Sequence, residues 1–256
     1  MFVLLGLSPI WASAPTPPER YAAHARADAA LLRLSPEGTA LWAQHILRAG
    51  DWREWRRLSE IEMLIGRQLA LETPDRGVLD HLVEAYALES ARTAQLRKRQ
   101  TVSTALQLSA ADRKAVGTFL KIRTERHLRP VEPDQIALPK SAAASIAANL
   151  YDLSPAGTRI LAEAAHKAGE PARSRERIEL AIGEELARDR ADLATLDGLV
   201  RRYAAEEARF EQRAKTRLLE TAFLLEPADR KRLAAFMTRS AAEALAGEKP
   251  VLEIVP

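Results

Sequence analysis

The feature that most restricts the fold of this chain is an internal repeat: its second half resembles its first. The segment LSPEGT at residues 34–39 recurs as LSPAGT at residues 153–158, a spacing of 119 residues. Further along, Tyr86 matches Tyr203 and the DRK triplet at 112–114 matches that at 229–231, a spacing of 117. Two segments that are this similar in sequence are expected to adopt the same fold. The sequence therefore predicts two diverged copies of one module.

Each module is predicted to be helical throughout. Ala, Leu, Arg and Glu are abundant and aromatic residues make up only 5% of the chain, which favours helix over sheet. Ser35 followed by Pro36 is typical of a helix start, and Gly50 of a helix end. We expect four helices in each module. In the first they cover about 35–50, 52–71, 75–107 and a short segment after 109, and in the second 154–169, 172–188, a long third helix and a short segment after 226.

The third helix of each module should form an antiparallel hairpin with the second. The TPD triplet at 73–75 is expected to start it, with Thr73 as the cap. The two short helices should flank the hairpin of their own module. Because one hairpin cannot bury both of its apolar faces, the other module is expected to cover the remainder. The predicted fold class is all-α, with two tandem copies of a hooked four-helix hairpin module paired as a pseudo-dimer within a monomer; a homodimer is the alternative.

The chain divides into five predicted parts. Residues 1–14 (MFVLLGLSPIWASA) form a signal-like segment or truncated anchor, because a short apolar run ends in an A-x-A pattern. The first module covers 15–127, a Pro-containing linker 128–139, the second module 140–249 and a tail 250–256, with short helices at 18–33 and 140–151 before the two modules. We therefore expect a periplasmic or exported protein. A frayed apolar N-terminus packed on the first module is the alternative.

Composition and motifs argue against several classes of function. The chain has no cysteine, which excludes disulfides and thiolate chemistry. Its 38 basic and 35 acidic residues leave a net charge of only +3, so no nucleic-acid partner is expected. It contains no glycine-rich phosphate loop and no activated-serine motif. We expect a protein that is not an enzyme and has no cofactor, whose partner is a protein or an unfolded client, and which meets a membrane only through an N-terminal anchor.

Three residues are weak candidates for a metal site: His45, Glu163 and His166. Glu163 and His166 form one E-x-x-H spacing, which places two ligands on one face of a helix. A di-iron site requires a second such motif on a facing helix, and the first half of the chain has none. A divalent transition metal is therefore the alternative, and histidines without a metal on half-buried helices are the simpler interpretation.

A second candidate surface lies at the start of the second helix. Trp52 and Trp55 stand three residues apart among Arg53 and Arg56, so they predict an apolar partner surface with a positive rim. The alternative is that these rings are buried and fix the start of the helix, which is the commoner use of large aromatic side chains. Trp42, on the preceding helix, is expected in the core.

The repeated pattern also carries a family resemblance. The order LSPEG, a helix ending at glycine, a charged hairpin, then LSAADRKAVGTFL or LEPADRKRLAAFM resembles the periplasmic heavy-metal-sensor and metal-resistance proteins, which are related to the Spy and CpxP stress chaperones. It covers about 34–126 and 153–245. The resemblance implies a periplasmic location, a hooked helical hairpin and pairing of hairpins. Metal-sensing relatives carry histidines four residues apart in the first short helix, whereas His45 has Leu41 and Ala49 at that spacing.

From the repeat, the signal-like start and this resemblance we expect a non-enzymatic envelope sensor or chaperone-like protein that acts by protein–protein contacts. Two alternatives stay open: a metal-binding protein with a non-standard His, Glu and Met site, or a cytosolic helical scaffold.

Overall fold

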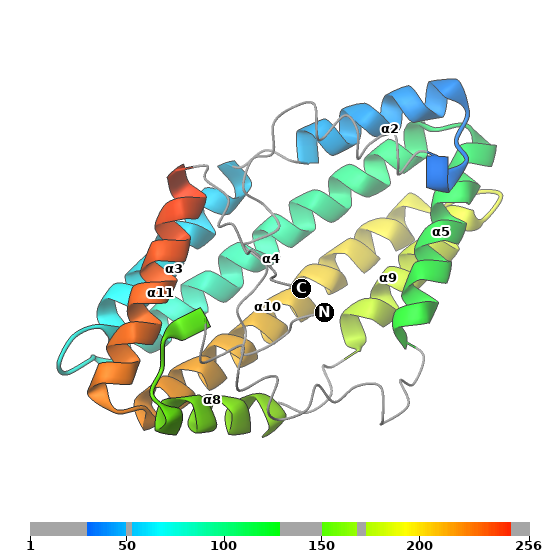
Figure 1. The fold of residues 1–256 in the computed structure, drawn as a ribbon. Helices are drawn as coiled ribbons and strands as arrows, with labels where there is room; N and C mark the ends of the chain where they lie inside the picture. Colours follow the sequence, from blue (N-terminus) through cyan, green and yellow to red (C-terminus); the bar gives the residue numbers. More distant parts are fainter. Residues whose placement is uncertain (1–29, 50–52, 129–149, 168–172, 247–256) are drawn as a thin grey trace.

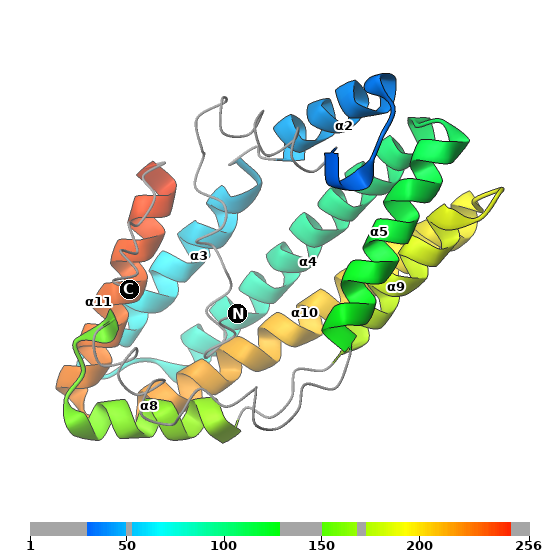
Figure 2. The ribbon, with the colours of Figure 1, turned by 45° about the vertical axis from the view of Figure 1, so that its right-hand side comes forward.

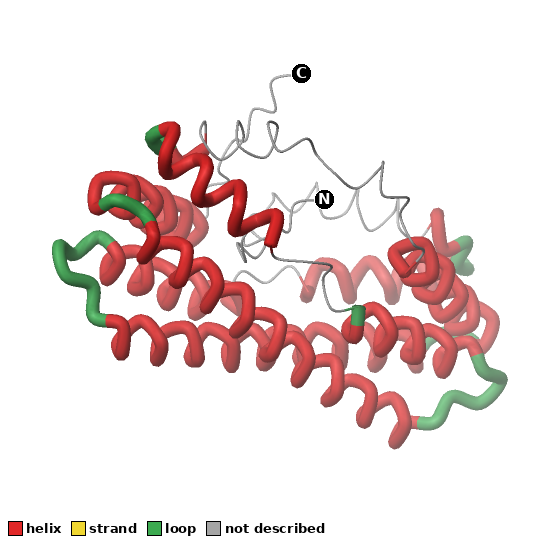
Figure 3. Tube along the Cα trace, turned by 90° about the horizontal axis from the view of Figure 1, so that it is seen from below, coloured by secondary structure: helices red, strands yellow, loops and turns green. Residues whose placement is uncertain are grey.

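The computed structural model describes residues 30–49, 53–128, 150–167 and 173–246. This part of the chain is all-α: helices joined by short turns, with no strand (Figure 3). The helices of the first half are α2 (Pro36–Ala49), α3 (Arg53–Leu69), α4 (Arg76–Gln107) and α5 (Ala110–Leu128). Those of the second half are α8 (Pro155–Lys167), α9 (Ser174–Ala187), α10 (Leu193–Leu224) and α11 (Pro227–Ala246).

The helix boundaries lie within about three residues of those expected from the sequence, except that α5 and α11 are not short. One cap was assigned wrongly. The N-cap of α4 is Asp75, not Thr73: its backbone is extended and its carboxylate accepts a hydrogen bond from the Val78 N–H at 3.1 Å. Asp192 caps α10 in the same way. The segments 1–14 and 250–256 lie outside the described residues, as do linker residues 129–139. Of the helices expected at 18–33 and 140–151 the structure describes only the ends, and residues 30–32 and 150–151 are helical.

The two long helices, α4 and α10, lie side by side across the middle of the molecule (Figures 1 and 2). They are antiparallel, because Ser90 contacts Glu207 whereas Arg99 contacts Asp197. At one end of this pair α5 packs against α9, and at the other end α11 packs against α3. We expected each closing helix to flank the hairpin of its own module. Each instead packs chiefly on the second helix of the other half.

The core is divided between the two ends of the α4–α10 pair, and each part draws residues from both halves of the chain. At the α3–α11 end Leu58, Ile65 and Tyr86 of the first half pack with Leu218 and Met237 of the second. At the α5–α9 end Trp42 and Val116 pack with Ile182 and Leu196, which confirms that Trp42 is a core residue. Neither half could bury these apolar surfaces alone.

Small residues let the closing helix approach its partner closely. Gly117 of α5 lies against Gly183 and Ala187 of α9: a Cβ added at Gly117 would stand 2.6 Å from the Gly183 carbonyl oxygen and from the Ala187 nitrogen. At the other end Gly66 of α3 faces Ala234 of α11, and a Cβ there would lie 3.0 Å from the Ala234 oxygen. Contacts this short between backbones leave no room for a side chain.

The repeated LSPxGT segment ties a short helix to a closing helix in each half. The Ser35 backbone N–H donates to the Asp112 carboxylate at 2.8 Å and its hydroxyl donates to the same group at 2.6 Å. Ser154 makes both contacts with Asp229, at 2.9 and 2.5 Å. Gly38 is needed because a Cβ there would stand 2.5 Å from an Asp112 oxygen. Burial acts to raise the pKa of Asp112, but hydrogen bonds from Ser35 and Ser109 outweigh burial and hold that pKa below its ordinary value.

The repeated arginine of the DRK triplet anchors each closing helix to the other half. The Arg113 guanidinium donates to the carbonyl oxygens of Leu186, Arg188 and Asp189 at the end of α9, at 2.7–2.9 Å. Arg230 donates in the same way to three carbonyls at the end of α3. A cation at a helix C-terminus satisfies carbonyls that have no partner within the helix.

Candidate functional site

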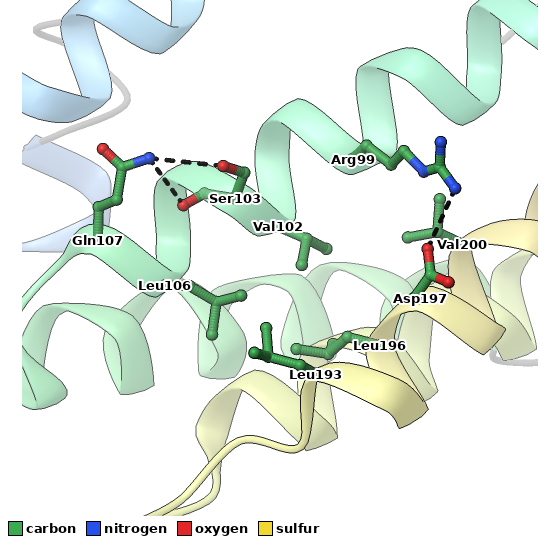
Figure 4. Close-up of a pocket in the computed structure, with 9 residues that line it drawn as sticks. All are labelled: Arg99, Val102, Ser103, Leu106, Gln107, Leu193, Leu196, Asp197 and Val200. Carbon is green, nitrogen blue, oxygen red and sulfur yellow. Dashed lines mark hydrogen bonds and ion pairs between the residues drawn. The ribbon is translucent and has the colours of Figure 1, made fainter.

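The candidate site is a groove of about 470 Å³ between the C-terminal part of α4 and the N-terminal part of α10 (Figure 4). It lies at the α5–α9 end of the α4–α10 pair, which we call the open end. Both long helices supply its walls. Its lining residues are Arg99, Val102, Ser103, Leu106, Gln107, Leu193, Leu196, Asp197 and Val200.

The groove has an apolar floor and a polar rim. Val102, Leu196 and Val200 are buried beneath it, whereas Leu106 is half-buried and Leu193 is 66% exposed. At the rim Asp197 is shared by two arginines: Arg99 lies 3.2 Å from one carboxylate oxygen and Arg201 lies 2.8 Å from the other. Two guanidinium groups around one carboxylate leave this rim with a local excess of positive charge.

The same place at the opposite end of α4–α10 is filled, and we call it the filled end. Positions 117 residues from Leu106 and Leu193 hold Phe223 and Arg76. The larger Phe223 ring packs against the core cluster there, and the Arg76 guanidinium lies over it at 5.7 Å from the ring centroid. The groove therefore exists at one end because leucines stand where the other end has a phenylalanine and an arginine.

The two ends also differ in charge. Arg201 corresponds to Glu84 and Ser103 to Glu220, and the shared aspartate corresponds to Asp80. Gln107, on the groove rim, corresponds to Leu224, which is 70% exposed. The open end is thus recessed, with two arginines and one aspartate at its rim, and the filled end presents an exposed leucine where three carboxylates and Arg76 occupy the matching positions.

Partly buried charges brace α4, α5 and α9 at the open end. Glu179 of α9 accepts from Lys98 of α4 at 2.5 Å and from Arg123 of α5 at 2.7 Å. Burial acts to raise the pKa of this carboxyl, but attraction to Lys98 and Arg123 outweighs it, so the pKa of Glu179 lies below its ordinary value. At the filled end the matching pair is Lys215 with Glu62, 2.8 Å apart.

This arrangement can accept apolar side chains. An apolar floor of this kind gains free energy by removing apolar side chains from water, at about 25 cal/mol per Å². The polar rim can orient what binds through charge and hydrogen bonds. The groove lining contains no histidine and no nucleophile paired with a base.

The structure does not bring the candidate metal ligands together as a described site. Glu163 is an exposed residue of α8, whereas the side chains of His45 and His166 lie outside what the structure describes. Among the side chains that are described, no group of three acidic or histidine residues is placed to hold a metal ion. Metal binding remains a prediction.

The tryptophan surface is only partly described. Trp55 is half-buried, packs against the core and lies beneath the Arg97 guanidinium, 3.9 Å from the ring centroid. Arg56 lies on the exposed side of α3, 3.1 Å from Glu60. Trp52 and the side chain of Arg53 fall outside the described residues. For Trp55 the burial interpretation is the better one, and the partner surface stays a prediction.

The groove was missed by the sequence analysis. A signal was present in the repeat: residues 106 and 193 are leucines where the other copy has a large ring and a cation. The predicted modules depend on residues that the two halves share. The groove depends on residues that differ between the halves at matching positions.

The fold and the groove define a broad class: an all-helical protein in the described residues, built on a long antiparallel helix pair, with a groove of apolar floor at one end. Comparison of the chain with protein-family models, curated proteins and solved structures found no match. In the parts of the chain that the structure describes, no helix has the length and apolar character needed to span a membrane.

Proposed function

We propose that this chain is a non-enzymatic envelope sensor or chaperone-like protein that acts by binding protein segments. The observation that carries the proposal is the open groove, because it offers an apolar floor and a charged rim without catalytic groups. A groove between two helices accepts apolar side chains of a partner helix or of an unfolded segment. The envelope location rests on the signal-like N-terminal sequence and on the resemblance to metal-resistance proteins and stress chaperones.

The proposal includes the finer architecture: two tandem copies of one module, paired as a pseudo-dimer. Contacts that occur twice support this. Lys98 with Glu179 corresponds to Lys215 with Glu62, and the two lysines lie 4.6 and 4.3 Å from the ring centroids of Tyr203 and Tyr86. The serine–aspartate and arginine–carbonyl contacts are also duplicated. In this arrangement the groove lies where one copy has Leu106 and Leu193 and the other copy has the larger Phe223 and Arg76.

The test is suppression of client aggregation by the purified protein. The decisive variant carries Leu106→Phe and Leu193→Arg, which gives the open end the residues that fill the other end. Because the chain already accommodates this pair at matching positions, the variant should fold. We expect it to require roughly tenfold more protein than the native chain for equal suppression, since several apolar contacts are lost.

The matched control is Leu88→Gln, which removes an exposed leucine (63% exposed) of α4 outside the groove. Its suppression should equal that of the native chain. Absence of suppression by the native protein, together with failure to capture any envelope protein from a lysate, would refute the proposed function. Equal loss in the control and the groove variant would mean that binding is not confined to the groove.

A further inference from the structure

We propose that, when no client is bound, the groove of one molecule holds the filled end of a second copy, in a head-to-tail contact. This inference rests on the proposed function, since it names a competitor for the same groove. It follows from two properties in which the ends of the α4–α10 pair differ: the exposed apolar surface and the charge.

The apolar surfaces are complementary. Leu224 is the last residue of α10 and is 70% exposed beside the half-buried Phe223. Its counterpart at the open end is Gln107, at the edge of a groove with Leu106 and Leu193 on its walls. One end thus offers a projecting leucine and the other end a recess lined by leucine and valine. Burying such a side chain in an apolar recess is favourable.

The charges are complementary as well. At the groove, Arg99 and Arg201 surround the single carboxylate of Asp197. At the filled end Asp80, Glu84 and Glu220 are exposed carboxylates at the positions that match Asp197, Arg201 and Ser103, and they outnumber Arg76, the cation at the position that matches Leu193. A second copy that brings Leu224 to the groove would bring these carboxylates toward the two arginines. Opposite charges facing each other across an interface favour encounter and fix its orientation.

The contact is heterologous, because the groove and the projecting leucine lie at opposite ends of the same helix pair. Each molecule therefore keeps one unused end after the first contact. Such contacts produce open chains or rings instead of a closed twofold dimer. Assembly and client binding exclude each other, because both occupy the groove. A client would therefore dissociate the assemblies. At high protein concentration without a client, the groove would be occupied by a second copy.

Sedimentation velocity on the full-length protein over a range of concentrations tests this. We expect species larger than a dimer in the native chain, which decrease on dilution and at high salt. Two variants should each be monomeric at concentrations where the native chain assembles: the groove variant Leu106→Phe with Leu193→Arg, and Leu224→Gln, which copies the residue found at the open end. Each should weaken self-association by roughly tenfold or more.

Mixing the two variants gives the sharpest result. The groove variant retains Leu224 and the Leu224→Gln variant retains its groove, so an equimolar mixture can form one contact. We expect a heterodimer and nothing larger. A twofold dimer through Leu224 of both molecules would instead leave the groove variant dimeric, and that outcome would overturn the proposal, as would a native chain that stays monomeric throughout.

The same variants separate this inference from the proposed function. Leu224→Gln should suppress client aggregation at least as well as the native chain, because its groove is intact and no longer occupied. Loss of assembly with retained client binding supports both statements. Assembly that persists in Leu224→Gln refutes the inference alone, and a native chain that assembles but suppresses no aggregation refutes client binding alone.

Discussion

The open and filled ends of the α4–α10 pair share a framework and differ in their surfaces. At both ends an aspartate holds a serine of the repeated LSPxGT segment, and an arginine donates to the last carbonyls of the helix opposite. The residues that line the groove, by contrast, differ in size and charge from those at the matching positions of the filled end. The framework positions are constrained by the packing of the halves, whereas positions at the surface are constrained less.

The ends also differ in how deeply they bury charge. Lys215 at the filled end is 1% exposed and pairs with Glu62 on a single carboxylate oxygen. Lys98 at the open end is 20% exposed, and its partner Glu179 also receives Arg123. Removing one member of a buried pair leaves the other charge without compensation, and the cost grows with burial. The two pairs should therefore respond differently to the same substitution.

The largest effect is expected from Glu62→Gln. The change keeps the shape of the side chain but removes the carboxylate that pairs with the buried Lys215 ammonium at 2.8 Å. We expect a loss of about 3–5 kcal/mol in the free energy of unfolding, the range found when one partner of a buried ion pair is removed. Urea denaturation at neutral pH measures it, with helix content followed by circular dichroism.

Glu179→Gln is the matched change at the open end. Because Lys98 and Arg123 are both partly exposed to water, we expect a smaller loss, about 1–2 kcal/mol. If the two variants lose equal stability, the difference in burial between the ends has no energetic consequence.

Much of this fold could be predicted from the repeat and from helix-start signals. Ser35 with Pro36 marked the start of α2, and the TPD triplet at 73–75 marked the start of α4 at Arg76. The packing of each closing helix, α5 or α11, on the second helix of the other half could not be predicted. An apolar helix face with a small residue such as Gly117 packs equally well on either hairpin as far as sequence shows, and only the three-dimensional path of the chain after α4 decides between them.

A further loss in the free energy of unfolding is expected from a substitution where α5 and α9 approach closely. Gly117→Ala would place a methyl group 2.6 Å from backbone atoms of Gly183 and Ala187, so the helices must separate. We expect a loss of about 2–3 kcal/mol, at the upper part of the range for overpacked sites. The melting temperature should fall accordingly, and amide exchange in α5 and α9 should accelerate more than in α3 and α11.

Gly198→Ala is the control, since nothing lies within 4 Å of a Cβ added there. An alanine at position 198, in the second turn of α10, should stabilise the protein by up to about 1 kcal/mol through helix propensity. The filled end already carries Ala234 at the position that matches Gly117. If Gly117→Ala is as stable as the native chain, the close contact at the open end is not a packing constraint.

The groove itself could be predicted less well than the fold. Its walls consist of Leu106, Leu193 and Val102, residue types that occur throughout any helical core, and no motif marks them. What distinguishes them is the absence of a covering side chain. The open end has leucines where the filled end has Phe223 and Arg76. The sequence shows this difference, but only the structure shows that it leaves the apolar side chains of the open end uncovered.

The smallest effect is the part of the pH dependence that comes from Glu179 at the open end. Burial raises the pKa of Glu179, yet Lys98 and Arg123 lower it below its ordinary value of 4.5. A carboxyl whose folded-state pKa is lowered contributes stability above its unfolded pKa and loses it as the pH falls through the folded value. Melting temperatures between pH 6 and 3 should therefore fall less steeply in Glu179→Gln than in the native chain. Glu184→Gln, an exposed site on the same helix, should keep the native slope; equal slopes in all three proteins would show that the brace around Glu179 does not stabilise the open end.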